Sequence, residues 1–175
     1  NTLEPVMSKD STVQTLQCQV VVAGAARGRI LFSTEPLSFW GGYDYRTGEV
    51  IDRRHPLSGE NAGGCVLCVP ATRGSSTTTA VLLEAVKAGT APAAIVTTGV
   101  DTFFALASIV ADELYSLPIP LVALPPGDFA LLRAGVTAEL TAGGRISCPR
   151  PAAQPRTISA QCPRPAGSRV GHDPT

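Results

Sequence analysis

The residues of this chain that are best suited to chemistry lie between Val69 and Leu83. The stretch reads Val-Pro-Ala-Thr-Arg-Gly-Ser-Ser-Thr-Thr-Thr-Ala-Val-Leu-Leu. An apolar, strand-like run over 65–69 leads into a polar turn, and a helix-like apolar pattern follows directly. The turn therefore belongs at the N-terminus of a helix, where unpaired backbone N–H groups and the helix dipole favour a bound anion.

Five consecutive residues would form this anion site. Arg73 carries a planar guanidinium that suits a carboxylate or a phosphate, and the hydroxyl of Ser75 would lie beside the bound group. The other members are Gly74, Ser76 and Thr77. The alternative is that the serines and threonines are ordinary helix caps and that Arg73 is a solvated charge. A nucleotide P-loop is excluded, because no lysine follows the glycine and the glycine spacing of that motif is absent.

Composition narrows the classes of partner. The chain has 175 residues, enough for one domain with a real core. Its formal net charge of zero argues against a nucleic-acid partner, which would require a basic surface. Only 16% of the residues are charged, below the usual share of about a quarter. This bias favours apolar surface covered by another domain or subunit, although lineage composition would explain it equally.

The sequence also predicts a cytoplasmic location. No stretch approaches the roughly 20 apolar residues of a membrane span, so we expect no membrane association. The chain does not open with the charged and then apolar segment of a secretory signal. Its five cysteines are an odd number, which favours a reducing compartment over a disulfide framework.

Cys65 and Cys68 form a C-x-x-C pattern that invites a metal or redox interpretation. They lie in an apparent strand, where residues three apart point to opposite faces, so we interpret them as small buried hydrophobic residues. Cys148 and Cys162 stand in a proline-rich stretch without a histidine at zinc-finger spacing and are interpreted as incidental. We therefore predict no metal site and no cofactor on this chain.

The surrounding elements are predicted from hydrophobic periodicity. Two β-rich runs, over 13–22 and 28–33, would form a hairpin through 23–27. The long irregular stretch over 34–64 would be a packed loop that docks on something. Strands are then expected over 65–69, 93–97, 119–124 and 136–141, and helices over 76–88, over 101–114 and directly after 125–128. Gly89 would close the first helix and Asp101 would cap the second. This alternation predicts an α/β fold with crossover helices on a parallel or mixed sheet.

The folded domain is expected to span 12–144. Residues 1–11 form a polar start that we expect to be disordered. From Arg145 the composition shifts towards proline and arginine, and Cys-Pro-Arg-Pro-Ala occurs at 148–152 and again at 162–166. Such a segment cannot bury a core, so 145–175 is predicted to be a disordered tail or linker.

Structural roles are predicted for one histidine, two aspartates and two phenylalanines. For His55 a structural hydrogen-bonding role is favoured over contact with a substrate or partner. Asp44 and Asp52 are interpreted as turn-forming acids, with contact to a partner as the alternative. Phe103 and Phe104 are adjacent on a helix and cannot share one face, so at least one of them is expected in the core.

Three motifs, together with the polar turn, resemble one family. They are Pro36-Leu37-Ser38-Phe39-Trp40-Gly41-Gly42-Tyr43-Asp44, Thr47-Gly48-Glu49-Val50-Ile51-Asp52 and His55-Pro56-Leu57-Ser58-Gly59-Glu60, followed by Arg73-Gly74-Ser75-Ser76. In this order they are similar to the swivel domain, or small subunit, of the aconitase X family, over about residues 17–141. The chain departs from the family pattern at Thr77-Thr78-Thr79-Ala80, where relatives continue with Ser-Gly-Ser.

The resemblance implies a swivelling β/β/α domain that closes over a large catalytic domain or subunit. Members of the family are hydro-lyases that dehydrate small hydroxy acids, either cis-3-hydroxy-L-proline or mevalonate 5-phosphate. An iron or iron–sulfur centre sits on the large part, and the serine after Arg-Gly accepts the proton. That position here is Ser75. We expect cis-3-hydroxy-L-proline, because the arginine-rich and lysine-poor composition is unlike that of the archaeal members.

The expected chemistry agrees with these residues. Dehydration removes a proton from the carbon next to a carboxylate, and a serine acts as a base only in a desolvated, electropositive setting. Arg73 and the N–H groups that open the helix would supply that setting and bind the carboxylate. The leaving hydroxyl needs a Lewis acid, which the large partner would provide.

Two other functions stay open. One is a non-catalytic swivel module that binds a partner or a small anion. The other is an aconitase-like isomerase acting on a tricarboxylic acid, although one arginine is too few to bind three carboxylates.

Overall fold

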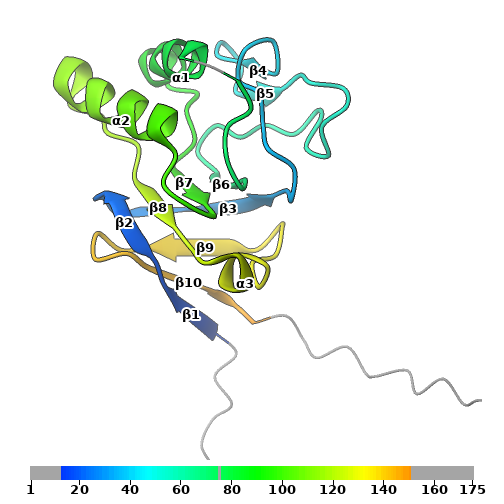
Figure 1. Ribbon diagram of the computed structural model, residues 1–175, viewed down its shortest axis with the longest axis vertical. Helices are drawn as coiled ribbons and strands as arrows, with labels where there is room; N and C mark the ends of the chain where they lie inside the picture. Colours follow the sequence, from blue (N-terminus) through cyan, green and yellow to red (C-terminus); the bar gives the residue numbers. More distant parts are fainter. Residues whose placement is uncertain (1–12, 75, 151–175) are drawn as a thin grey trace, which may run out of the picture.

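One mixed sheet that nearly closes on itself forms the frame of the domain (Figure 1). The computed structural model describes residues 13–74 and 76–150. The strands of this sheet are β1 (Val13–Gln17), β2 (Gln19–Val22), β3 (Ala26–Phe32), β6 (Val66–Cys68), β7 (Ala94–Thr97), β8 (Leu121–Ala123), β9 (Thr137–Leu140) and β10 (Arg145–Pro149). Their order is β1-β10-β9-β3-β6-β7-β8-β2. A small hairpin of β4 (Tyr43–Asp44) and β5 (Glu49–Val50) lies in the loop after β3.

Strand β3 joins the two halves of the sheet. Residues 26–29 pair antiparallel with β9, and residues 30–32 pair parallel with β6. On the other side the chain runs from β1 to β2 through Cys18, so that β1 pairs with β10 while β2 pairs with β8. Strands β3, β6, β7 and β8 are parallel, and their carboxyl ends therefore share one edge of the sheet.

The helices cover one half of this sheet. Helices α1 (Thr77–Ala88) and α2 (Thr102–Tyr115) lie next to each other over the parallel strands, while α3 (Pro126–Phe129) lies beside the antiparallel half (Figure 1). Alternate residues of β6 enter two different cores, since Leu67 faces the helices whereas Val66 and Cys68 face the interior of the curved sheet. The predicted α/β class with a mixed sheet and crossover helices is confirmed.

Most of the predicted elements agree with the structure to within two residues at each end. Helix α1 ends at Gly89, whose φ of 74° lets its N–H reach the carbonyls of Ala85 and Val86. Helix α2 is capped by Asp101, whose carboxylate accepts hydrogen bonds from the backbone N–H groups of Phe103 and Phe104. Phe104 is buried in the core under the helices, as expected for one of the two phenylalanines. The last helix begins at Pro126 itself rather than after Asp128.

The predicted N-terminal hairpin is wrong. β2 and β3 follow each other in the chain, but β2 pairs with β8 and β3 pairs with β6 and β9. The connection passes close to the residue before β8 at Gly24, where an added Cβ would lie 2.5 Å from Cγ of Pro120. The local pattern of two adjacent β-rich runs carries no information about these distant partners.

The predicted C-terminal boundary at 144 is also wrong. Residues 145–149 form β10, which lies between β1 and β9. Its residues alternate, so that Ile146 and Cys148 are buried in the interior core. Cys148 is therefore a core residue and not incidental. The expectations for 1–11, for Cys162 and for the rest of the tail after Arg150 concern residues outside the described ones.

Candidate functional site

The polar turn lies where an α/β sheet usually binds ligands. It connects β6 to α1 at the shared carboxyl edge of the parallel strands, and the segments after β3 and β7 lie at the same edge. Ligands of open α/β sheets bind outside the carboxyl ends of the strands. The structure thus brings Arg73, Gly74, Ser76 and Thr77 together between this edge and the start of α1. Ser75 lies outside the described residues, and its role stays a prediction.

The backbone before the turn is held on one side by Leu37. The N–H of Leu37 donates to the carbonyl of Ala71 at 3.3 Å, and the N–H of Arg73 donates to the carbonyl of Leu37 at 2.9 Å. Leu37 and Thr72 form an isolated parallel bridge, and the side chain of Leu37 is fully buried. The motif around Leu37 therefore fixes the backbone up to Arg73.

Asp101 holds the same backbone on the other side. Its Oδ2 accepts hydrogen bonds from the N–H of Thr72 at 2.7 Å and from the hydroxyl of Thr72 at 2.9 Å. Its Oδ1 accepts the two bonds that cap α2, at 3.0 and 3.1 Å. The sequence predicted the cap but not the contact with Thr72, because that contact joins residues 29 positions apart.

The side chain of Arg73 is exposed and only weakly paired. Its Nη2 lies 3.8 Å from Oε2 of Glu35, and the two side chains are 63% and 56% exposed. An exposed pair at this distance contributes little, so the guanidinium stays available to an anionic ligand. It lines a cavity of about 320 Å³ with Glu35, Asp52, Arg54, His55 and Pro56.

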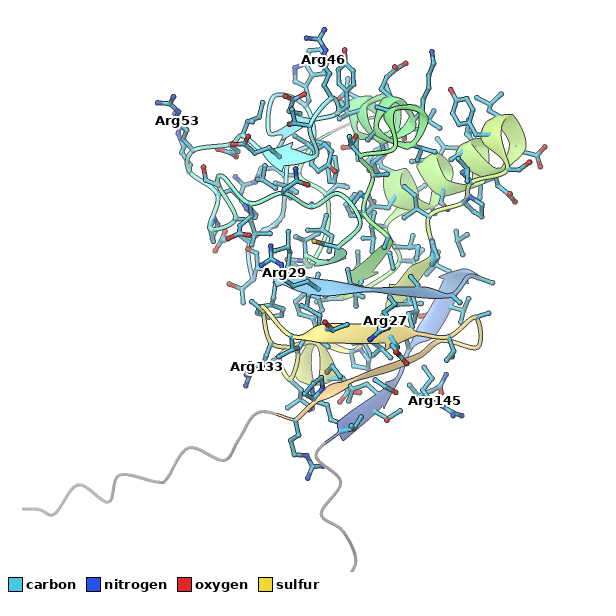
Figure 2. The ribbon with its side chains drawn as sticks, turned by 180° about the vertical axis from the view of Figure 1, so that it is seen from behind. Arg27, Arg29, Arg46, Arg53, Arg133 and Arg145 are labelled. Atoms are coloured by element: carbon cyan, nitrogen blue, oxygen red, sulfur yellow. The ribbon has the colours of Figure 1, made fainter. Side chains whose placement is uncertain are left out.

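Arg54 lines this cavity together with Arg73, whereas several other arginines are spread over the molecule. Figure 2 labels six of them, from the long loop at one end to the antiparallel strands at the other: Arg46, Arg53, Arg29, Arg27, Arg133 and Arg145. Arg29 pairs with Glu60 at 2.8 Å, and Arg27 pairs with Glu139 at 3.2 Å. Arg73 thus differs from these two in the length of its ion pair as well as in its position.

The start of α1 departs from the simple capping alternative at one residue. Ser76 has helical dihedral angles, φ −52° and ψ −15°, and its side chain makes no capping hydrogen bond. Gly74 has φ 126°, a conformation that L side chains rarely adopt, and its nearest neighbour for an added Cβ is Oγ of Ser38 at 4.0 Å. Backbone conformation rather than crowding therefore favours glycine before Ser75.

His55 has the structural role that the sequence favoured. Its Nδ1 accepts a hydrogen bond from the N–H of Leu57 at 3.1 Å, and its Nε2 lies 3.2 Å from the carbonyl oxygen of Glu35. Since Nδ1 is an acceptor here, the proton sits on Nε2 and donates to Glu35. His55 thereby holds the backbone of the residue that faces Arg73.

Asp44 and Asp52 form turns, as predicted. Their Oδ1 atoms accept from the N–H groups of Arg46 at 2.9 Å and Arg54 at 3.0 Å. The long loop that contains them packs on its own domain, where the side chains of Phe39 and Tyr43 are buried.

The described cysteines do not fit an iron centre. Cys65 belongs to the core under the helices, whereas Cys68 belongs to the interior core, so their thiols point apart. Burial raises the pKa of the Cys68 thiol well above its ordinary value and that of Cys18 to about 11, which disfavours the thiolate that binds metals. Within 13–74 and 76–150, no group of three or more histidine, cysteine, aspartate or glutamate side chains could hold a metal ion.

Of the helices that the structure describes, none is both long and apolar enough to cross a membrane.

Several known proteins are similar to this chain in sequence or in structure. The family model described as aconitase X swivel domain matches residues 15–148. The chain is 48% identical over 106 residues to cis-3-hydroxy-L-proline dehydratase of Pseudomonas aeruginosa, covering 61% of this chain but only 18% of that protein. It is 40% identical over 128 residues to the phosphomevalonate dehydratase small subunit of Methanothermobacter thermautotrophicus, covering 73% of this chain and 93% of the subunit. The crystal structure of Thermococcus kodakaraensis aconitase X matches with a TM-score of 0.69 and 31% identity, covering 77% of this chain and 98% of that one.

Proposed function

Because the chain belongs to the aconitase X swivel-domain family, we propose that it supplies one half of the active site of a hydro-lyase. The other half would come from a large domain or subunit of aconitase X type. The substrate is a small hydroxy acid, from which the complete enzyme removes water. The observation that carries this proposal is the placement of Arg73, with a fixed backbone and an exposed guanidinium, at the carboxyl edge of the parallel strands.

The residues of this chain would perform two parts of the reaction. The guanidinium of Arg73 binds the substrate carboxylate, and Gly74, Ser76 and Thr77 shape the site beside it. Ser75 in its deprotonated form accepts the proton from the carbon next to that carboxylate and becomes the neutral hydroxyl, and the positive field of Arg73 and of the N-terminus of α1 would favour that deprotonated form. The electron pair of the broken C–H bond forms the double bond, and the hydroxyl group leaves the adjacent carbon as hydroxide, for which the large partner would supply the Lewis acid.

The iron or iron–sulfur centre implied by the family would belong to the large partner. The burial of Cys68 and the opposite directions of Cys65 and Cys68 support this assignment, because these thiols cannot serve together as ligands.

The preferred substrate is cis-3-hydroxy-L-proline. The higher identity to the dehydratase named for it supports this choice, at 48% against 40% for the phosphomevalonate subunit. Mevalonate 5-phosphate is the second candidate, because the phosphomevalonate small subunit aligns along nearly its whole length. A helix N-terminus with one arginine accepts a carboxylate or a phosphate, so the site itself fits both compounds.

The test is to incubate the complete two-part enzyme with each compound and to follow the loss of substrate. The proposal predicts turnover of cis-3-hydroxy-L-proline. Turnover of mevalonate 5-phosphate alone would reverse the order of the two substrates while supporting a hydro-lyase. Turnover of neither compound, with a folded complex present, would contradict the proposal and favour a non-catalytic module.

A further inference from the structure

The carboxylate of Asp101 makes twice the contacts that a helix cap requires. One oxygen is enough to cap a helix, and Oδ1 serves α2 in this way. Oδ2 is committed to both donors of Thr72, and the residue is only 9% exposed. Such bonds to a carboxylate are about twice as strong as neutral ones. The second oxygen therefore holds a residue that stands immediately before Arg73 and three positions before Ser75.

Three more hydrogen bonds join the polar turn and its flanks to the segment around Asp101. Ahead of the turn, the N–H and the hydroxyl of Thr98 both donate to the carbonyl of Pro70 at 3.1 Å. Beyond the turn, the hydroxyl of Thr79 donates to the carbonyl of Phe103 at 3.2 Å. The segment over 98–103 thus contacts the chain before, next to and after the turn, with Asp101 at its centre.

We infer that Asp101 is a positioning residue of the active site. It fixes Thr72, and through Thr72 the backbone that leads at the carboxyl edge of β6 into Arg73, two residues before the predicted base Ser75. This inference rests on the proposed function and deepens it, because it names the residue outside the turn on which the geometry of the site depends. Misplacing a reacting group by about 1 Å costs on the order of a hundredfold in rate. Losing the two hydrogen bonds from Thr72 to Oδ2 of Asp101, which we call the brace, should therefore have a measurable effect on catalysis.

The kinetic test compares variants that remove the brace in different ways. An amide cannot accept bonds on both of its sides, so Asp101→Asn cannot keep both the α2 cap and the two bonds from Thr72. Thr72→Val removes the hydroxyl bond alone and leaves the cap untouched. We expect kcat of the two-part enzyme to fall at least about tenfold in Asp101→Asn and less in Thr72→Val, with KM changed much less than kcat. Thr72→Ser, which keeps both donors, should restore most of the kcat lost in Thr72→Val.

A second readout does not depend on activity. Hydrogen exchange of the Thr72 and Arg73 amides in the full chain should become at least about tenfold faster in Asp101→Asn. Asp44→Asn is the matched control, since Asp44 also accepts from a backbone N–H but lies in the β4–β5 hairpin. Unchanged exchange at Thr72 in Asp101→Asn, or wild-type kcat in both variants, would overturn the inference. An inactive wild-type complex with accelerated exchange in Asp101→Asn would instead contradict the proposed function while supporting the brace.

Discussion

At Arg73, a fixed backbone carries a side chain that is open to solvent. The N–H of this residue donates to the carbonyl of Leu37, while its guanidinium lies 3.8 Å from the carboxylate of Glu35, its ion-pair partner among the residues that the structure describes. Glu35 is itself held through its carbonyl by His55. A substrate carboxylate would replace Glu35 as the partner of Arg73 and gain the two-pronged geometry that a guanidinium offers.

Replacing the guanidinium of Arg73 by an ammonium group tests whether Arg73 binds the substrate carboxylate. Arg73→Lys is expected to raise KM about tenfold or more, because an ammonium cannot make the paired hydrogen bonds of a guanidinium. Steady-state kinetics of the two-part enzyme measure this. Arg27→Lys is the control, since Arg27 pairs with Glu139 on the sheet. A normal KM for Arg73→Lys would remove Arg73 from substrate binding.

Ser75 is the proposed base of the reaction, and its replacement tests that role. Ser75→Ala should lower kcat by at least about a hundredfold, the scale of a lost general base, while substrate binding changes little. Ser147→Ala, which alters a hydroxyl between β10 and β1, should leave kcat unchanged. If Ser75→Ala turns over substrate at a near-normal rate, Ser75 is not the base.

Among the elements, those determined by local signals were predictable. β6 and β7 read as apolar runs because both faces of these strands are buried, and α1 and α2 carry their end signals at Gly89 and Asp101. The pairing of β2 with β8 and the contact of Asp101 with Thr72 depend on residues distant in the chain, so the sequence held no local signal for them. The turn was found because its residue types, rather than its tertiary contacts, suggest anion binding.

Strand β10 was missed because its alternation runs into the proline-rich repeat. Ile146 and Cys148 point inward while Arg145 and Pro149 are exposed, which is the pattern of a half-buried strand. The prolines that follow favoured the prediction of a disordered tail from Arg145. In the described part of the chain, however, β10 lies between β1 and β9.

The role of β10 predicts two different truncations. Ending the chain at Arg150 should leave its melting temperature unchanged, whereas ending it at Gly144 should prevent cooperative folding.

Ile146→Ala should cost about 2–5 kcal/mol of unfolding free energy, since this side chain is fully buried. Val13→Ala, at a half-exposed position in the neighbouring strand, should cost far less. Chemical denaturation measures both, and a folded chain ending at Gly144 would show that β10 is dispensable.

At the scale of the whole molecule, large apolar side chains are exposed in the segment beside the turn and along α2. Trp40, in the segment beside the turn, is 71% exposed, and Leu106, Ile109 and Leu114 are exposed along α2. This agrees with the expectation of apolar surface that came from the low share of charged residues. The proposed division of labour assigns the base and the anchor to this domain and the iron centre to its partner, so neither half should act alone.

The most direct measurement is therefore a titration of the purified chain into a fixed amount of the large partner, with turnover of cis-3-hydroxy-L-proline as the signal. We expect no turnover from either part alone, and turnover that rises with added chain until the two are equimolar. A Ser75→Ala chain should bind the partner to the same stoichiometry without restoring turnover. Full activity of the large partner alone, or of this chain alone, would contradict an active site shared between the two.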